Sequence, residues 1–253
     1  MMVRIDRTGE GVDLTFEVLT QKGSREINED SIYANYANNK GLFVVADGLG
    51  GHGKGDIASS LAVTTFKGVF ETHTGPLSEL FSSAFSQAQS AILSEQAQTG
   101  SPFQMKTTVC ALAVDGEDMM WAHIGDTRLY AFSRNKAKIR TLDHSVPQML
   151  ALAHDIKERD IRNHPDRNRL LRVLGISGET PRFDVSELQR SSRYQAFLLC
   201  SDGFWELILE KEMGAALKKS TSAADWLNRM KKIVETRGSG TDMDNYSAIA
   251  IWM

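Results

Sequence analysis

Acidic residues follow three of the most apolar segments of this 253-residue chain. Asp47 comes after Leu-Phe-Val-Val-Ala, Asp126 after Trp-Ala-His-Ile-Gly, and Asp202 after Ala-Phe-Leu-Leu-Cys-Ser. Asp244 lies shortly before the last apolar segment. A carboxylate beside a buried strand cannot point into the core without a partner. We therefore expect these four side chains to lie at the rim of a core.

Carboxylates that gather at one rim repel one another and take up protons unless cations compensate them. Arg25 is the one cation close to them in sequence, whereas Glu29 and Asp30 add further negative charge. Divalent ions are the natural compensation, and a ligand set made only of oxygen favours Mg²⁺ or Mn²⁺. The chain has neither His-Glu-x-x-His nor Cys-x-x-Cys, and its six histidines are scattered, which argues against zinc.

The acidic motifs also have purely structural interpretations. Asp115-Gly116, between two apolar segments, is typical of a hairpin turn, and Asp202 could be no more than the start of a helix. The loop after Asp47 has more glycine than a turn needs and leads straight into a helix pattern. Such a loop lets the backbone approach a ligand and present a carbonyl oxygen to a metal ion. Its spacing matches neither a dinucleotide-binding fingerprint nor a P-loop, so a nucleotide cradle is the weaker alternative.

The elements that must position these residues are strands and one-sided amphipathic helices. Pro76 is expected in the first turn of one helix, and Ser145 and Ser222 are expected to cap two others. Together the patterns predict a layered α+β sandwich. The predicted strands are 14–20, 31–37, 41–47, 107–114, 119–125, 127–132, 194–202 and 246–252, and the predicted helices are 57–70, 77–92, 145–152 and 222–234.

Composition excludes several classes of protein. An apolar fraction of 42% and a charged fraction of 24% exclude a disordered chain. A net charge of −3 excludes the positive potential that would bind a nucleic acid and a polybasic patch that would bind a membrane. Cys110 and Cys200 lie within apolar segments, which predicts buried, reduced thiols. No secretory signal, membrane span, repeat or linker is recognisable. We expect one cytoplasmic domain over residues 1–253, with residues 1–12 frayed and a flap-like excursion at about 154–181.

Taken in order, these motifs resemble the metal-dependent serine/threonine protein phosphatases (protein phosphatase 2C-like), especially the small bacterial stand-alone type. The resemblance runs from about residue 14 to the end of the chain. One motif would be weak, but six in order are highly specific. The matching segments are 23–30, 45–52, 125–130, 142–145, 199–203 and 244–245, and 164–168 and 173–175 look like the flap of the family.

The resemblance implies a four-layer α-β-β-α sandwich of two antiparallel sheets flanked by helices, forming a single phosphatase catalytic domain. It also implies two Mn²⁺ or Mg²⁺ ions per chain. Asp47 would bridge them, the Gly48 carbonyl would complete one site, and Asp202 and Asp244 would ligate the other ion. Asp126, with help from Asp202, matches a third and weaker metal position. The residues expected to hold metal-bound waters or to position the ligands, without touching the ions themselves, are Glu29, Asp30 and Asn245.

The implied reaction is attack of a metal-activated water on phosphorus, in line with the departing Ser or Thr oxygen and without a phosphoenzyme. Arg25 would bind the substrate phosphate through two oxygens at once. Many eukaryotic members carry a His directly after the Asp-Gly pair as a proposed general acid, whereas this chain has Leu49. Metal-bound water or solvent must then protonate the leaving group, because His52 is better interpreted as structural.

The first hypothesis is a phosphatase that acts on phosphoproteins and opposes a serine/threonine kinase. The alternative is a catalytically weak, phosphatase-like module that binds a partner or phosphopeptide, and a third idea is a hydrolase of small phosphate esters. A complete set of carboxylates favours an enzyme. We expect a monomer with no nucleic-acid or membrane partner. For Asp126 a structural alternative remains, in which it is a turn carboxylate paired with Arg128.

Overall fold

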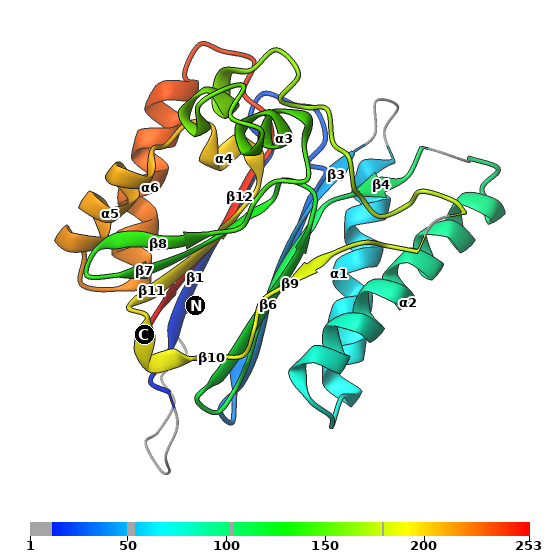
Figure 1. Cartoon of the computed structure of the whole chain (residues 1–253), viewed down its shortest axis with the longest axis horizontal. Coiled ribbons are helices and arrows are strands. Elements are labelled where there is room, and N and C mark those ends of the chain that lie inside the picture. The colour runs from blue at the N-terminus through cyan, green and yellow to red at the C-terminus, as the bar shows by residue number, and fades with distance from the viewer. Residues whose placement is uncertain (1–11, 50–53, 102–103, 179) are drawn as a thin grey trace.

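The computed structural model describes residues 12–49, 54–101, 104–178 and 180–253. Two antiparallel sheets pack face to face, and helices cover the outer face of each sheet (Figure 1). The fold is therefore the α+β sandwich that the sequence predicts, with layers in the order α-β-β-α. Within the described residues, no helix is long and apolar enough to cross a membrane.

The first sheet holds the two ends of the described chain side by side, because β1 pairs with β12 along their whole length. All of its pairings are antiparallel. In spatial order its strands are β1 (Thr15–Gln21), β12 (Tyr246–Trp252), β11 (Ala196–Cys200), β7 (Arg128–Ser133) and β8 (Lys136–Arg140).

The second sheet is centred on β3, which is the longest strand and is buried over most of its length. Its path runs through β10 (Gln189–Arg190), β6 (Asp118–Ile124), β5 (Val109–Asp115), β3 (Lys40–Leu49) and β2 (Asp30–Ala37); β4 (Lys106–Thr107) pairs with β3 and β9 (Asp184–Val185) with β6.

Alternation along β3 explains the layering. Phe43 and Val45 point into the core between the sheets, where they join residues such as Leu199 and Ile249. Leu42 and its alternate neighbours point the other way, into the core under the outer helices. A strand that is apolar on both faces needs cover on both sides, and the four-layer arrangement provides it.

Two helices cover each sheet. The second sheet is covered by α1 (Gly55–Thr72) and α2 (Leu77–Gln98), and the first by α5 (Glu210–Lys219) and α6 (Ala223–Gly238) (Figure 1). Ser222 caps α6 as predicted, since its Oγ accepts the Asp225 N–H at 3.1 Å. Pro76 lies at the N-cap of α2, one residue before the predicted position.

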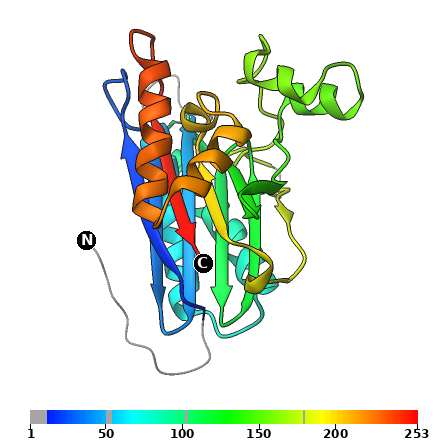
Figure 2. The same cartoon turned by 90° about the vertical axis from the view of Figure 1, so that its left-hand side faces the viewer.

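The segment after β8 stands away from the sandwich (green in Figure 2), and it includes the stretch at about 154–181 for which the sequence predicts a flap-like excursion. It contains α3 (Val146–Leu152) and a short 3₁₀ helix, η1 (Glu158–Asn163), and is otherwise irregular. Ser145 caps α3, with Pro147 near its start. A second 3₁₀ turn, η2 (Ser191–Arg193), leads into β11, and α4 (Asp202–Trp205) follows it.

Candidate metal centre

Asp30 and Asp47 face each other across neighbouring strands of the second sheet. Asp30 opens β2, Asp47 lies near the end of β3, and the two are directly paired in the antiparallel register. Directly opposed residues in such a pair lie close together, and two like charges there destabilise the pair. The strand geometry therefore brings two carboxylates together even though 16 residues of turn and strand separate them in sequence.

Asp202 comes to the same place from the first sheet. β11 ends at Cys200 and β12 begins at Tyr246, so antiparallel pairing puts Asp202 and Asp244 at one edge of this sheet. Asp202 starts α4, which lies at the upper end of the sandwich in Figure 1. Its carboxylate is within hydrogen-bonding reach of Asp47. Two sheets thus contribute to one cluster of carboxylates, as the sequence predicts.

The cluster raises the pKa values of its members. Burial, and then neighbouring carboxylates such as Asp202, raise the pKa of Asp30 to about 7. Burial and the charge of Asp244 raise the pKa of Asp202 to about 6. Burial and Asp202 hold the pKa of Asp47 well above its usual range. A carboxyl group with a raised pKa is stabilised in its charged form when a metal cation replaces its proton.

The donor atoms fit divalent metal ions. Oδ2 of Asp30 accepts a hydrogen bond from Ser201 Oγ at 2.8 Å, but its buried Oδ1 has no partner among the described residues. An orphaned, buried carboxylate oxygen in an otherwise all-oxygen cluster suits hard ions such as Mn²⁺ or Mg²⁺, which take oxygen ligands and bound water.

The backbone at Gly48 passes too close to its neighbours for any side chain. A Cβ at this position would lie 2.2 Å from the Gly55 carbonyl oxygen and 2.6 Å from that of Glu29. The Glu29 side chain also reaches this point, where its Oε1 accepts the Gly55 N–H at 3.2 Å. Glycine at position 48 thus lets the start of α1 close against the cluster. His52 lies outside the described residues.

Arg25 lies beside the cluster, half exposed. Its Nε and Nη2 donate to the two carboxylate oxygens of Asp244, each at 3.1 Å, and Asp242 lies 3.7 Å from Nη1. The residue expected to bind phosphate therefore holds a candidate metal ligand. Its fork of donors suits a phosphate as well as a carboxylate.

Asn245 fastens the segment that carries Arg25 and Glu29. Its Oδ1 accepts the Glu29 N–H at 2.8 Å, and its Nδ2 donates to the carbonyl oxygens of Lys22 and Ile27 at 2.9 and 3.0 Å. The side chain is buried and has no further donor to offer. Asn245 therefore positions backbone behind the cluster.

Asp126 is buried close to Asp202, which is the carboxylate with the strongest influence on its pKa. Burial and Asp202 raise that pKa well above its usual range. In the alternative interpretation Asp126 pairs with Arg128, and the charge of Arg128 does lower the pKa of Asp126, against these larger effects. Arg128 instead forms two hydrogen bonds to Asp143, from Nε at 2.8 Å and Nη2 at 2.6 Å. Within the described part of the chain, Asp126 thus makes no hydrogen bond or ion pair with Arg128, and its third-metal role stays a prediction.

Three further groups that can bind metal come together near Asp126. They are His123 on β6, His144 before α3 and Asp184 on β9. The rings of His123 and His144 stack with centroids 4.7 Å apart. The alternation of side chains along β6 could have predicted that His123 is buried. No pattern in the sequence near His123 predicts that Asp184 lies beside it.

Hydrogen bonding at His144 opposes metal binding by this group. Nδ1 accepts the Gly125 N–H at 3.2 Å, so Nε2 carries the ring proton and donates it to Asp184 at 3.2 Å. Arg172 pairs with the other oxygen of Asp184 at 3.1 Å and adds positive charge. These residues form a hydrogen-bonded link between the end of the flap and the loop before Asp126.

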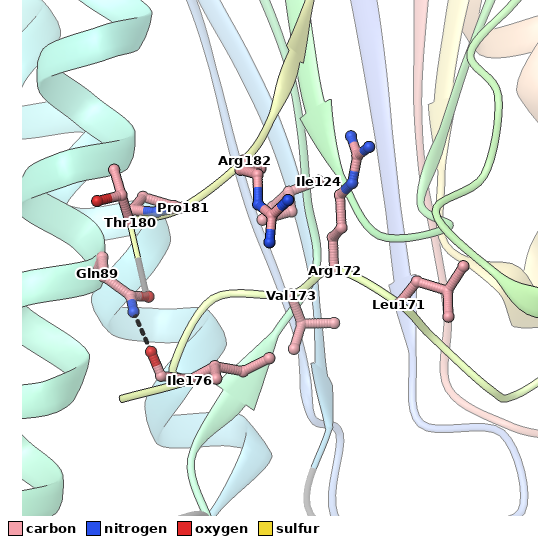
Figure 3. A pocket seen from close by; sticks show the side chains of 9 residues that line it. All are labelled: Gln89, Ile124, Leu171, Arg172, Val173, Ile176, Thr180, Pro181 and Arg182. Carbon is pink, nitrogen blue, oxygen red and sulfur yellow. Dashed lines mark hydrogen bonds between the residues drawn. The ribbon is translucent and has the colours of Figure 1, made fainter. Parts of the chain in front are cut away.

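A small cavity lies at the other end of this link, between α2 and the segment around residues 171–182 (Figure 3). Its volume is about 30 Å³, which suits a water molecule and excludes a substrate. Gln89 Nε2 donates to the Ile176 carbonyl oxygen at 2.7 Å, as drawn in Figure 3. This contact fastens the flap connection to α2, and it lies away from the carboxylate cluster.

Comparisons with known proteins agree with this geometry. The model of the protein phosphatase 2C family matches residues 21–246. The serine/threonine phosphatase stp of Listeria welshimeri is 31% identical over 219 residues, covering 83% of this chain and 85% of that protein. The crystal structure of the serine/threonine phosphatase Stp1 from Staphylococcus aureus has a TM-score of 0.85 at 23% identity and covers 99% of both chains. The catalytic domain of the phosphatase PstP, in complex with 2 manganese ions, has a TM-score of 0.78 at 25% identity, covering 94% of this chain and 97% of that one.

Two antiparallel sheets between helical layers are also the fold of the Staphylococcus aureus structure, as its TM-score of 0.85 shows. The family match extends over most of the chain. The chain belongs to the protein phosphatase 2C family, and it is a metal-dependent protein serine/threonine phosphatase.

Proposed function

We propose that the chain hydrolyses phosphoserine and phosphothreonine in proteins at a binuclear Mn²⁺ or Mg²⁺ centre, in opposition to a serine/threonine kinase. The observation that carries this proposal is the meeting of Asp47 and Asp202. They come from different sheets and lie within hydrogen-bonding reach, and their pKa values are both raised. Two carboxylates this close need either a shared proton or bound cations to offset their repulsion, and proteins of this family depend on metal ions.

In this proposal Asp47, the Gly48 carbonyl, Asp202 and Asp244 hold two ions, and Asp126 with Asp202 holds a third and weaker one. When bound, such ions polarise the phosphoryl group and lower the pKa of water. Every other part of the mechanism falls to the side chains around them.

Arg25 orients the substrate. Its Nε and Nη2 grip two phosphate oxygens in the geometry that they now use for Asp244. Asp30, fixed by Ser201, and Glu29, fixed at the start of α1, keep acceptors for water behind the cluster. Asn245 holds the backbone that carries Glu29.

No protein nucleophile is required. Cys110 and Cys200 are free and fully buried, and burial raises the pKa of both thiols, so neither is a thiolate at neutral pH. Leu49, next to the cluster, has no proton to give. The proton for the departing serine or threonine oxygen comes from water.

The substrates are phosphoproteins, and the chain works as a cytoplasmic monomer beside its kinase. Phosphate release from a phosphothreonine peptide, with and without Mn²⁺, tests the central claim, and a sugar phosphate serves as the comparison. We expect turnover of the peptide that depends on Mn²⁺. Faster turnover of the sugar phosphate would overturn the substrate class. Tight peptide binding without turnover would support the non-catalytic alternative instead.

A further inference from the structure

A second polar cavity lies between η1 in the flap and the start of α5. Its volume is about 330 Å³, which is in the range of small-ligand sites. Unlike most such sites, it is lined by charged side chains. The lining residues are Arg128, Arg140, Glu158, Arg159, Arg162 and Glu210.

Arginines outnumber glutamates in the lining of this arginine cavity. Arg128 and Arg140 share one buried carboxylate, Asp143, with hydrogen bonds of 2.6 to 3.4 Å. Arg140 also binds Glu158 at 2.5 Å. The lining itself holds four arginines and two glutamates. Two carboxylates outside the lining pair with these arginines, Asp143 with Arg128 and the half-exposed Asp160 with Arg159. The lining is therefore rich in guanidinium groups, which suits an anion better than a metal ion.

Arg162 carries the unsatisfied donor. Its side chain is only 10% exposed, and its Nη2 binds Glu210 at 2.5 Å. Its Nη1 is buried and has no hydrogen-bond partner within the described part of the chain. A buried guanidinium N–H without an acceptor is costly, and an incoming anion would supply one.

Of the two glutamates that line the cavity, Glu158 is the more easily displaced, because it is 68% exposed and can turn into water. Glu210 is 40% exposed, and its Oε1 also accepts a hydrogen bond from the Tyr130 hydroxyl at 3.3 Å. The arginine partners of these glutamates cannot turn into water, because Arg140 and Arg162 are each only 10% exposed. A phosphoryl group with several acceptor oxygens would satisfy both guanidinium groups at once, which a single carboxylate does less well.

One indole ring separates the arginine cavity from the candidate metal centre. The guanidinium carbon of Arg128 lies 3.4 Å from the centre of the Trp205 ring, and that of Arg162 lies 5.5 Å from it. On the other side, Trp205 Nε1 donates to the backbone carbonyl of Asp126 at 3.0 Å. The arginine cavity and the candidate metal centre are therefore neighbours on either side of the buried Trp205.

We propose that the arginine cavity binds a second phosphoryl group of the same substrate, so that the enzyme favours proteins phosphorylated at two nearby residues. The proposal rests on the proposed function for the first phosphate. Arg162 and Arg140 are the recognising residues. The flap contributes one wall through η1, so the flap takes part in the choice of substrate.

The test is a binding experiment with peptides that the enzyme cannot cleave. One peptide carries a single phosphonate analogue of phosphothreonine, and a series adds a second phosphonate at successive positions on either side. Fluorescence anisotropy in the presence of Mn²⁺ gives each Kd. We expect about tenfold tighter binding at a preferred spacing, the size of one good charged hydrogen bond. No gain at any spacing would overturn the proposal.

Three variants make the result specific. Arg162→Gln should remove the gain, and Glu158→Gln, which removes a competing carboxylate, should increase it. Arg193→Gln, at an exposed arginine of η2 away from the cavity, is the matched control and should leave the gain unchanged. An equal gain in Arg162→Gln would reject the site.

Two further measurements separate the alternatives. A glutamate at the preferred position that binds as tightly as the phosphonate would reject phosphoryl recognition in favour of general acidic recognition. Hydrolysis of a singly phosphorylated peptide, measured in parallel, reports on the proposed function alone. Its failure would leave the Kd series as an independent test of the arginine cavity.

Discussion

Arg25 and Asp244, which are 219 residues apart in sequence, form two parallel hydrogen bonds of 3.1 Å. Each has a separate candidate role, the first as a phosphate binder and the second as a metal ligand. Their pairing means that the guanidinium compensates Asp244 when no cation does so. In the proposed function, metal binding at Asp244 would release the fork of Arg25 toward the substrate, and this would couple metal loading to phosphate capture.

Arg25→Ala should raise KM for a phosphopeptide by about tenfold or more and lower kcat by less. A phosphate clamp that holds the ground state and the transition state alike contributes uniform binding, and its loss appears in KM. Arg25→Lys keeps the positive charge but not the forked donors, so its KM should lie between those of the wild type and Arg25→Ala. Steady-state kinetics on one peptide measures all three. A collapse of kcat with unchanged KM would instead mean that Arg25 acts mainly on the transition state.

The sequence predicts the strand ends well because the signal is local. A buried strand followed by an aspartate is visible in ten residues, and Asp47, Asp126 and Asp202 all lie where that pattern places them. Antiparallel pairing then brings Asp30 opposite Asp47. The sandwich follows from the same apolar segments, because strands that are buried on both faces need cover on both sides.

Partners distant in sequence could not be predicted in this way. Arg128 binds Asp143 rather than its near neighbour Asp126, because a loop brings Asp143 under β7. The strand β8 and the helix α5 were also missed. β8 is short, charged and half exposed, and the apolar face of α5 is narrow, with charged residues at both ends. Their place is decided by packing against the first sheet rather than by local pattern.

Chelation should abolish turnover, and Mn²⁺ or Mg²⁺ should restore it. The cluster offers only oxygen ligands, so a bound ion is the electrophile available to polarise the phosphoryl group. The measurement is phosphate release before and after treatment with excess EDTA, followed by back-titration with each ion. Full activity in excess EDTA would refute the binuclear mechanism.

Asp47→Asn should stabilise the metal-free chain while removing its response to Mn²⁺. Burial and Asp202 disfavour a charge at Asp47, so an amide there should raise the free energy of unfolding by about 1 kcal/mol in chelator. In the wild type, added Mn²⁺ should raise Tm through binding to the folded state, and in the variant it should not. Asp115→Asn, in an exposed ion pair with Lys40, is the control and should respond as the wild type does. Equal Mn²⁺ stabilisation in Asp47→Asn would remove Asp47 from the ligand set.

His144 should make the fold sensitive to acid. Burial and the neighbouring His123 lower the pKa of His144 to about 4, against 6.5 in the unfolded chain. The unfolded state therefore binds more protons between these values, so His144 contributes stability that is present above pH 6.5 and is lost as pH falls toward 4. The loss is on the order of 2 kcal/mol.

Denaturant unfolding at several pH values tests this with His144→Gln, which cannot titrate. The variant is expected to be less stable at pH 7, because it loses the bond to Asp184, and to lose less stability on acidification. His73→Gln, at the C-terminal cap of α1, is the control and should follow the wild-type slope. Parallel curves for wild type and His144→Gln would contradict the assignment.

Asp126→Ala separates a third metal ligand from a structural carboxylate. Arg128 forms its short hydrogen bonds with Asp143 rather than Asp126, and Trp205 binds the backbone carbonyl of Asp126, which the variant keeps. The fold and the ligands Asp47, Asp202 and Asp244 should therefore survive. Turnover of a phosphoprotein should fall about 10²-fold, the scale of losing one acid–base or electrostatic group.

A nitrophenyl phosphate distinguishes the two roles of Asp126, because its good leaving group needs little protonation. In Asp126→Ala this substrate should lose much less activity than the phosphoprotein. Asp115→Ala, at the hairpin turn between β5 and β6, controls for general loss of an aspartate. Metal occupancy in a crystal of Asp126→Ala completes the test. Equal losses of activity on both substrates would reject the third site. Loss of the two central metal ions in Asp126→Ala would also reject it, because a ligand of the third ion alone is not needed to hold the other two.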